Sequence, residues 1–67
     1  MPYVNIKITD EGVSVEQKAR LVAAVTQVLK DVLNKKPEST FVVIDEVSTD
    51  NWGTAGELVT ERRRRGL

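Results

Sequence analysis

A short apolar run, Phe41-Val42-Val43-Ile44, constrains this 67-residue chain more than any other segment. Side chains of a strand alternate between its two faces, so this run predicts a strand that is buried on both sides. We expect the strand to span residues 40–47. One helix can cover only one of its faces. The other face needs a second cover, and in so short a chain the best candidate is another subunit.

The residues before this run predict a further strand and a helix. From Tyr3 to Thr9 every second residue is apolar, as in a strand with one buried face: Val4, Ile6 and Ile8. Ser14 and Gln17 have the spacing of a capping box, which marks the start of a helix. Apolar residues then recur at helical spacing as far as Leu33, and Pro37 prevents the helix from continuing.

A strand, a helix and a strand in this order form a βαβ unit. The connection is long enough for a parallel, right-handed crossover. Residues 48–56 are rich in turn formers, and residues 57–60 are expected to form a short strand or a turn of helix. We therefore predict an α/β (α+β) fold with a C-terminal hairpin or turn segment, in a single domain that spans residues 1–67.

The composition excludes several classes of site. Cysteine and histidine are both absent, so disulfides and a thiolate or imidazole zinc site are excluded. Ten basic and ten acidic residues cancel, which leaves no overall positive field for nucleic acid. No apolar run could span a bilayer, and a secretory signal pattern is missing. We expect a cytoplasmic protein without a metal, a nucleic-acid partner or membrane association.

The one charge cluster is the run from Arg62 to Arg65. A short arginine run is typical of a solvated tail. The alternative is carboxylate or anion binding, for which the guanidinium fork is well shaped. The acidic pair Asp45 and Glu46 is adjacent on the second strand, so the two carboxylates face opposite sides and are expected to be solvated.

Pro2 is the one candidate for a general base. The Ser-His and Cys-His pairs of nucleophilic catalysis are impossible in this chain. Methionine is normally removed before a small residue such as proline, and removal of Met1 converts the Pro2 nitrogen to a secondary amine. In an apolar cavity the pKa of that amine falls towards neutrality, which suits a general base. By position alone, an ordinary strand-start proline is the better explanation of Pro2.

Several segments occur in the order of a known family: Met1-Pro2 before a strand, the Glu11-Gly12 turn, residues 14–18 at the helix start, the Pro37 loop, Asp45-Glu46, and Asn51-Trp52-Gly53-Thr54-Ala55-Gly56-Glu57-Leu58. With this collinear set the chain resembles the 4-oxalocrotonate tautomerase family over nearly its whole length. The last segment resembles the aromatic-Gly-x-x-Gly-Glu-Leu block of the family and is the most specific.

The resemblance implies a fold, an assembly and an activity. Members are βαβ subunits assembled as homo-oligomers, typically hexamers, and we expect a hexamer here. Their N-terminal proline moves a proton between carbon and oxygen of 2-oxo acids, without a cofactor or metal. Pro2 matches that base, and Trp52 matches the aromatic residue of the pocket. For Trp52, packing in the core or at a subunit interface is an equally good explanation.

Two positions at which the best-known members carry arginine are apolar here. One is Val13, and the other is Phe41 or Val42, depending on the length of the preceding loop. The usual contacts to substrate carboxylates are therefore missing. We expect a more apolar substrate, such as an aryl or alkyl 2-oxo acid, bound near Val13, Phe41 and Trp52. Lys7, Arg62 and Arg63 are candidate replacement cations, of which we favour Arg62.

We predict a tautomerase that interconverts enol and keto forms of a 2-oxo acid or a similar enolisable carbonyl. The alternative is a non-catalytic structural or binding oligomer of the same fold. The apolar Val13 and Phe41 favour it, and so would retention of Met1, because an amide nitrogen is not basic. A third hypothesis, hydration or dehalogenation of an unsaturated acid, is disfavoured by the missing arginines.

Overall fold

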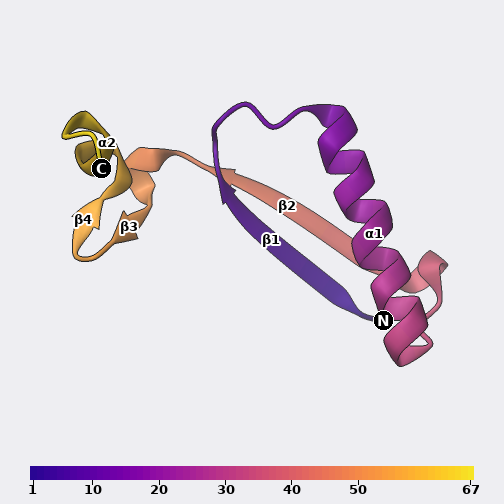
Figure 1. The fold of residues 1–67 in the computed structure, drawn as a ribbon. Helices are drawn as coiled ribbons and strands as arrows, with labels where there is room; N and C mark the ends of the chain where they lie inside the picture. The colour runs from indigo at the N-terminus through magenta and orange to yellow at the C-terminus, as the bar shows by residue number, and fades with distance from the viewer.

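A computed structural model describes residues 1–67 as a βαβ unit followed by a C-terminal arm, residues 48–67 (Figure 1). The βαβ unit contains β1 (Tyr3–Thr9), α1 (Val15–Leu33) and β2 (Phe41–Val47), with a 3-10 turn at Pro37–Ser39. The arm contains a 3-10 turn at Thr49–Asn51, then β3 (Gly53–Thr54), β4 (Glu57–Leu58) and α2 (Val59–Arg64). This is the predicted α+β fold, with the C-terminal segment formed as a hairpin.

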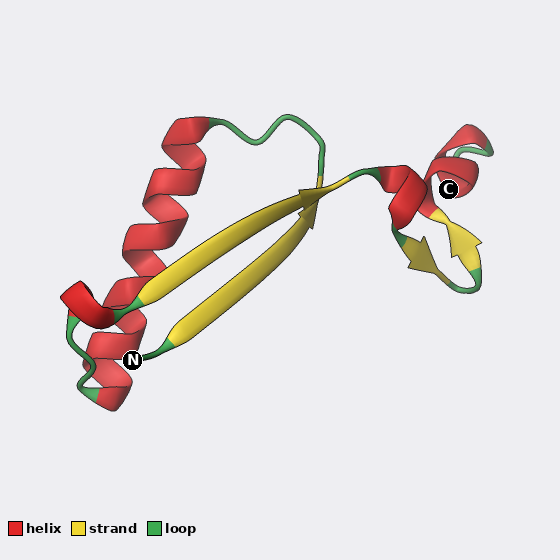
Figure 2. Ribbon diagram, turned by 180° about the vertical axis from the view of Figure 1, so that it is seen from behind, coloured by secondary structure: helices red, strands yellow, loops and turns green.

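The two long strands are parallel and in register from their first residues to their last. Tyr3 lies opposite Phe41, and Thr9 lies opposite Val47. One face of this sheet packs against α1, which crosses the strands obliquely and makes its larger contact with β2 (Figure 2). Five apolar residues of that face are half-buried: Val4, Ile6, Ile8, Val42 and Ile44. We call the other side the open face; it is formed by Tyr3, Asn5, Lys7, Thr9, Phe41, Val43, Asp45 and Val47.

Helix α1 begins at the predicted capping box. The Ser14 hydroxyl accepts the Gln17 N–H at 3.1 Å, and the Gln17 side-chain oxygen accepts the Ser14 N–H at 2.9 Å. Both bonds satisfy backbone donors that the first helical turn leaves free. The helix ends before Pro37, because Asn34 adopts a left-handed conformation (φ 55°) and its N–H binds the carbonyl of Lys30 at 2.9 Å.

The C-terminal arm folds on itself. β3 and β4 pair antiparallel around a two-residue turn, with Thr54 opposite Glu57. The N–H of Val59, at the start of α2, donates to the Trp52 carbonyl at 2.8 Å. The predicted alternatives for residues 57–60, a strand or a helical turn, are both realised: β4 ends at Leu58 and α2 starts at the next residue.

The arginine run is largely exposed, as predicted, but it is not an irregular tail. Arg62, Arg63 and Arg64 belong to α2, and Arg65 caps its C-terminal end. Each of the four guanidinium groups is paired with a carboxylate of the chain, because acidic residues lie around this helix: Glu11, Glu57 and Glu61. The prediction that Asp45 and Glu46 face opposite sides is confirmed, but both are paired: Asp45 with Lys7 on the open face, and Glu46 with Lys18 of α1.

The isolated subunit has no buried residue. Its radius of gyration is 15.3 Å, whereas a compact domain of this length has about 11 Å. Its accessible surface is 5038 Å², whereas about 4,200 Å² is expected for a compact monomer of its mass. On the open face, Tyr3 is 65% exposed and Phe41 51%. As predicted, one face of β2 lacks a cover within the chain. Neither helix combines the length and apolar character needed to cross a bilayer.

Candidate functional site

Pro2 lies at the amino end of the sheet, directly before β1. Its carbonyl oxygen accepts the N–H of Phe41 at 3.0 Å, which extends the parallel ladder by one bond beyond Tyr3. Proline has no N–H to contribute to a ladder, so the start of a strand is a position that it tolerates. The bond to Phe41 fixes the backbone of Pro2 to β2, and the side chain is half-buried.

The open face next to the Pro2 end of the sheet is apolar. Phe41 and Tyr3 are cross-strand neighbours there, and Val43, two residues further along β2, is 42% exposed. An amine in such surroundings loses part of its hydration when a second surface covers it, which disfavours its charged form.

The opposite end of the open face is charged. Asp45 accepts a hydrogen bond from Asn5 at 2.8 Å and pairs with Lys7 at 2.9 Å. The hydrogen bonds from Asn5 and Lys7 hold the pKa of Asp45 below its ordinary value. The hydrogen bond to Asp45 raises the pKa of Lys7. Lys7, one of the candidate replacement cations, is thus engaged with a carboxylate of its own chain.

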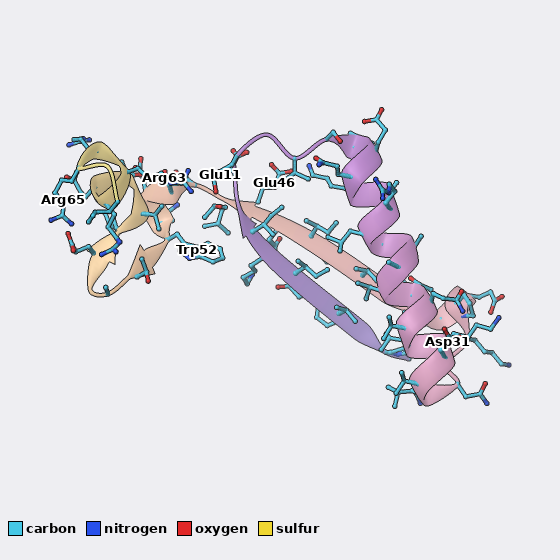
Figure 3. The ribbon with its side chains drawn as sticks, viewed as in Figure 1. Glu11, Asp31, Glu46, Trp52, Arg63 and Arg65 are labelled. Carbon is cyan, nitrogen blue, oxygen red and sulfur yellow. The ribbon has the colours of Figure 1, made fainter.

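The other predicted site residues lie beyond this charged end. Val13 is half-buried in the connection between β1 and α1. Trp52 precedes β3 on the arm and is half-buried. Arg62, in α2, pairs with Glu57 at 3.3 Å and its side chain is 29% exposed. Figure 3 shows Trp52 at the junction of the arm and the sheet, at the end opposite to the N-terminus.

The structure thus brings Pro2 and Phe41 together and separates them from Val13, Trp52 and Arg62. Seven residues of strand lie between the two groups, a distance of about 20 Å. Pro2 and Trp52 of one chain cannot line the same pocket, and the single subunit has no pocket. A site that contains both residues needs the arm of a second chain beside Pro2.

Two polar networks of the structure were not predicted from the sequence. The first consists of Asn5, Lys7 and Asp45. The sequence could have indicated it, because pairing the two strands from their first residues places Lys7 opposite Asp45. The second joins the carboxylate of Glu11 to Arg63 and to the hydroxyl of Thr9. Nothing local indicates the Glu11–Arg63 pair, since 52 positions separate the two residues. No cluster of three or more carboxylates is arranged to hold a metal ion.

Comparison with known proteins identifies a family and related chains. The family model of the tautomerase enzymes matches residues 2–62. The probable tautomerase K2 of Dickeya dadantii is 62% identical over 65 residues, which cover 97% of each chain.

Two solved structures have the same fold. A structure from a study of the 4-oxalocrotonate tautomerase isozymes of Methylibium petroleiphilum has a TM-score of 0.90 at 28% identity, and the match covers 97% of this chain and 100% of that one. A heterohexameric 4-oxalocrotonate tautomerase from Chloroflexus aurantiacus has a TM-score of 0.82 at 28% identity, with coverage of 91% and 97%.

Proposed function

This chain belongs to the tautomerase family and is a tautomerase; we propose that Pro2 is its general base and that its substrate is an aryl or alkyl 2-oxo acid, or a similarly apolar enolisable carbonyl compound. The observation that supports this most is the position of Pro2. The family match begins at this residue, which lies at the amino end of the sheet and whose carbonyl oxygen accepts the N–H of Phe41.

The proposed reaction moves one proton from oxygen to carbon. Removal of Met1 leaves Pro2 with a secondary amine, and a covered apolar site lowers the pKa of that amine so that part of it is neutral at pH 7. The neutral amine takes the proton of the enol hydroxyl, which leaves an enolate whose oxygen electrons form the carbonyl in the next step. The carbon–carbon double-bond electrons then take the proton back from the ammonium. The amine is regenerated, and no other reactant is consumed.

The proposed substrate follows from the side chains available to bind it. Phe41 of one subunit and Val13 of a neighbouring one would offer apolar contacts at the positions where the best-known members of the family carry arginine. Arg62 remains as the candidate contact for a single carboxylate, because it belongs to the same arm as Trp52; it would exchange Glu57 for the substrate. One cation and several apolar walls suit a 2-oxo acid with an aryl or alkyl substituent better than a dicarboxylate.

We further propose that the site is completed by self-association, as a hexamer. The Chloroflexus relative is a heterohexamer. The exposed apolar half of the open face provides a surface to bury, and the extended arm provides a means of reaching a neighbour. In this arrangement the arm of one subunit brings Trp52 to the Pro2 end of another, so that the indole walls the cavity and excludes water from the amine.

A non-catalytic binding or structural oligomer is the second candidate. It is favoured by the same two residues, Val13 and Phe41, which replace the cations expected of a carboxylate site. A form that keeps Met1 would also belong here, because the Pro2 nitrogen is then an amide. The fold and the assembly are common to both candidates, so only the chemistry at Pro2 separates them.

The deciding experiment is the ketonisation of phenylenolpyruvate, followed by ultraviolet absorbance with protein whose loss of Met1 is verified by intact mass. Pro2→Ala is expected to lower kcat/KM by about 100-fold or more, the usual effect of losing a general base. Pro37→Ala is the matched control, since Pro37 is the only other proline and lies in the turn before β2. Equal rates for the parent and Pro2→Ala would contradict the proposal and favour the non-catalytic candidate.

A further inference from the structure

The C-terminal arm makes its extensive contacts within itself. Helix α2 packs on β4 and on the 3-10 turn at Thr49–Asn51, and β3 packs on β4. Neither strand of the hairpin nor α2 packs extensively on β1, α1 or β2. The arm is therefore a small folded unit that projects from the end of β2 (Figure 1). Its elements make few contacts with the βαβ unit.

One side-chain ion pair joins the arm to the rest of the chain, and no other side-chain hydrogen bond does. The guanidinium of Arg63, in α2, binds the carboxylate of Glu11, in the turn after β1 (Figure 3). The other three arginines of α2 and its C-terminal cap bind glutamates of the arm itself: Glu57 and Glu61. Glu11 and Arg63 thus connect the βαβ unit and the arm, which are otherwise joined by the backbone at Ser48 and by few contacts.

Glu11 is prepared for this contact by its own turn. The hydroxyl of Thr9, the last residue of β1, donates to the same carboxylate. The hydrogen bond from Arg63, and to a smaller extent the one from Thr9, holds the pKa of Glu11 below its ordinary value. The carboxylate is therefore charged at neutral pH. Because Thr9 belongs to the sheet, the Glu11 carboxylate has a fixed position from which to hold α2.

Movement of α2 also moves Trp52. The backbone bond from Val59 to the Trp52 carbonyl, 2.8 Å long, ties the start of α2 to the residue before β3. Thr60 of α2 also donates to Asp50 at 2.5 Å, just ahead of Trp52. Arg63 and Trp52 therefore belong to the same hydrogen-bonded unit, and the direction of that unit decides where the indole points.

We infer that Glu11 and Arg63 are positioning residues, whose ion pair sets the direction of the C-terminal arm and so presents Trp52 to the Pro2 site of a neighbouring subunit. This inference rests on the proposed function, in which Trp52 walls that site. An exposed ion pair contributes little to stability, so the role of this one is geometric. Small displacements of a residue that shapes a site have large effects on catalysis.

The test compares Glu11→Gln and Arg63→Gln with Arg64→Gln. Arg64 is a matched control, because it lies next to Arg63 but pairs with Glu61 inside α2, at 3.0 Å. We expect either change at the pair to raise KM for phenylenolpyruvate and lower kcat/KM by about tenfold. A mere loss of folded protein would lower kcat and leave KM unchanged. The charge exchange Glu11→Arg with Arg63→Glu should recover most of the loss.

Trp52 provides a second readout that needs no activity, since it is the only tryptophan. Glu11→Gln and Arg63→Gln should make its fluorescence more easily quenched by acrylamide than in Arg64→Gln, and the exchange variant should reverse the change. Identical quenching and KM in all three single variants would overturn the inference, and so would an exchange variant that recovers neither. Failure of the proposed function has a different signature, a rate that does not depend on Pro2.

Discussion

The tightest backbone requirement at the scale of single residues lies in the turn between β3 and β4. Ala55 and Gly56 both have positive φ, 53° and 78°. A two-residue hairpin turn of this kind prefers Asn-Gly, because its first position is left-handed and strains most side chains. Ala55 therefore carries a conformational cost of about 1 kcal/mol that asparagine would reduce. A Cβ added at Gly56 would meet no atom within 4 Å, so its cost is also purely conformational.

Substitutions at the two positions of this turn should have opposite effects. Ala55→Asn is expected to raise the free energy of unfolding by about 0.5 kcal/mol, whereas Gly56→Ala should lower it by about 1 kcal/mol. Urea unfolding of the parent and both variants checks this at one fixed protein concentration, because assembly also contributes to the measured stability. Changes of the same sign in both variants would show that the turn differs from the one described.

At the scale of secondary structure, the parallel pair of strands is held differently at its two ends. Near Pro2 the open face carries aromatic and aliphatic side chains that are exposed in the single subunit. At the other end Asp45 of β2 links Asn5 and Lys7 of β1 through side-chain bonds. Side-chain pairs between adjacent strands favour one pairing register over the alternatives. The Asp45 network therefore supports the register in which Tyr3 lies opposite Phe41.

The contribution of Asp45 should depend on pH in a defined direction. Its hydrogen bonds lower its pKa from 3.8, so its stabilising effect is present above that value and is lost as the pH falls through the lowered pKa. Asp45→Asn should unfold at a lower temperature than the parent at pH 7. The difference between the two unfolding temperatures should become smaller towards pH 3. Lys7, whose pKa is raised, loses its contribution only when the pH rises above 10.5.

Thermal unfolding between pH 3 and pH 7 measures this dependence. Asp10→Asn is a suitable control, because Asp10 makes a backbone bond to Val47 and the structure has no ion pair at its side chain. It should change the unfolding temperature little. A gap between Asp45→Asn and the parent that stays constant down to pH 3 would rule out a contribution from the Asp45 charge.

At the scale of the whole molecule, the subunit is extended and lacks a buried core. Its principal extents are 45 × 25 × 15 Å, and the long dimension runs from the N-terminal end of the sheet to the arm (Figure 1). A chain of this size normally needs support beyond its own core, and disulfides are impossible without cysteine. We therefore expect folding and self-association to be coupled, with the apolar half of the open face buried between subunits.

Val43→Asp tests this expectation. The substitution places a carboxylate on the open face, at a position that is 42% exposed in the subunit. Burial of an unpaired charge costs several kcal/mol, so dissociation should occur at concentrations at least about 100-fold higher than for the parent. Sedimentation velocity across a dilution series measures it. Ala23→Asp is the control, since Ala23 lies on the exposed side of α1. A folded parent monomer at micromolar concentration would contradict the expectation.

The elements themselves could be predicted from the sequence because each has a local cause. Alternation over seven residues predicts β1, the Ser14–Gln17 capping box marks the start of α1, and the turn formers before Glu57 mark a hairpin. Residues of these motifs lie within about seven positions of one another, so local backbone geometry alone brings them together. The collinear motifs also indicated the family, and with it Pro2 as the candidate base.

The path of the chain beyond β2 was decided only by the tertiary structure. It separates Trp52 from Pro2 by the length of the sheet, and it turns the expected arginine tail into a helix whose Arg63 reaches Glu11. Lys7 and Asp45 likewise meet across 38 positions. Such contacts depend on where distant segments come together, which no local propensity encodes. The sequence by itself therefore determined the elements and the candidate base, and the tertiary structure decided which candidate residues one subunit can bring together.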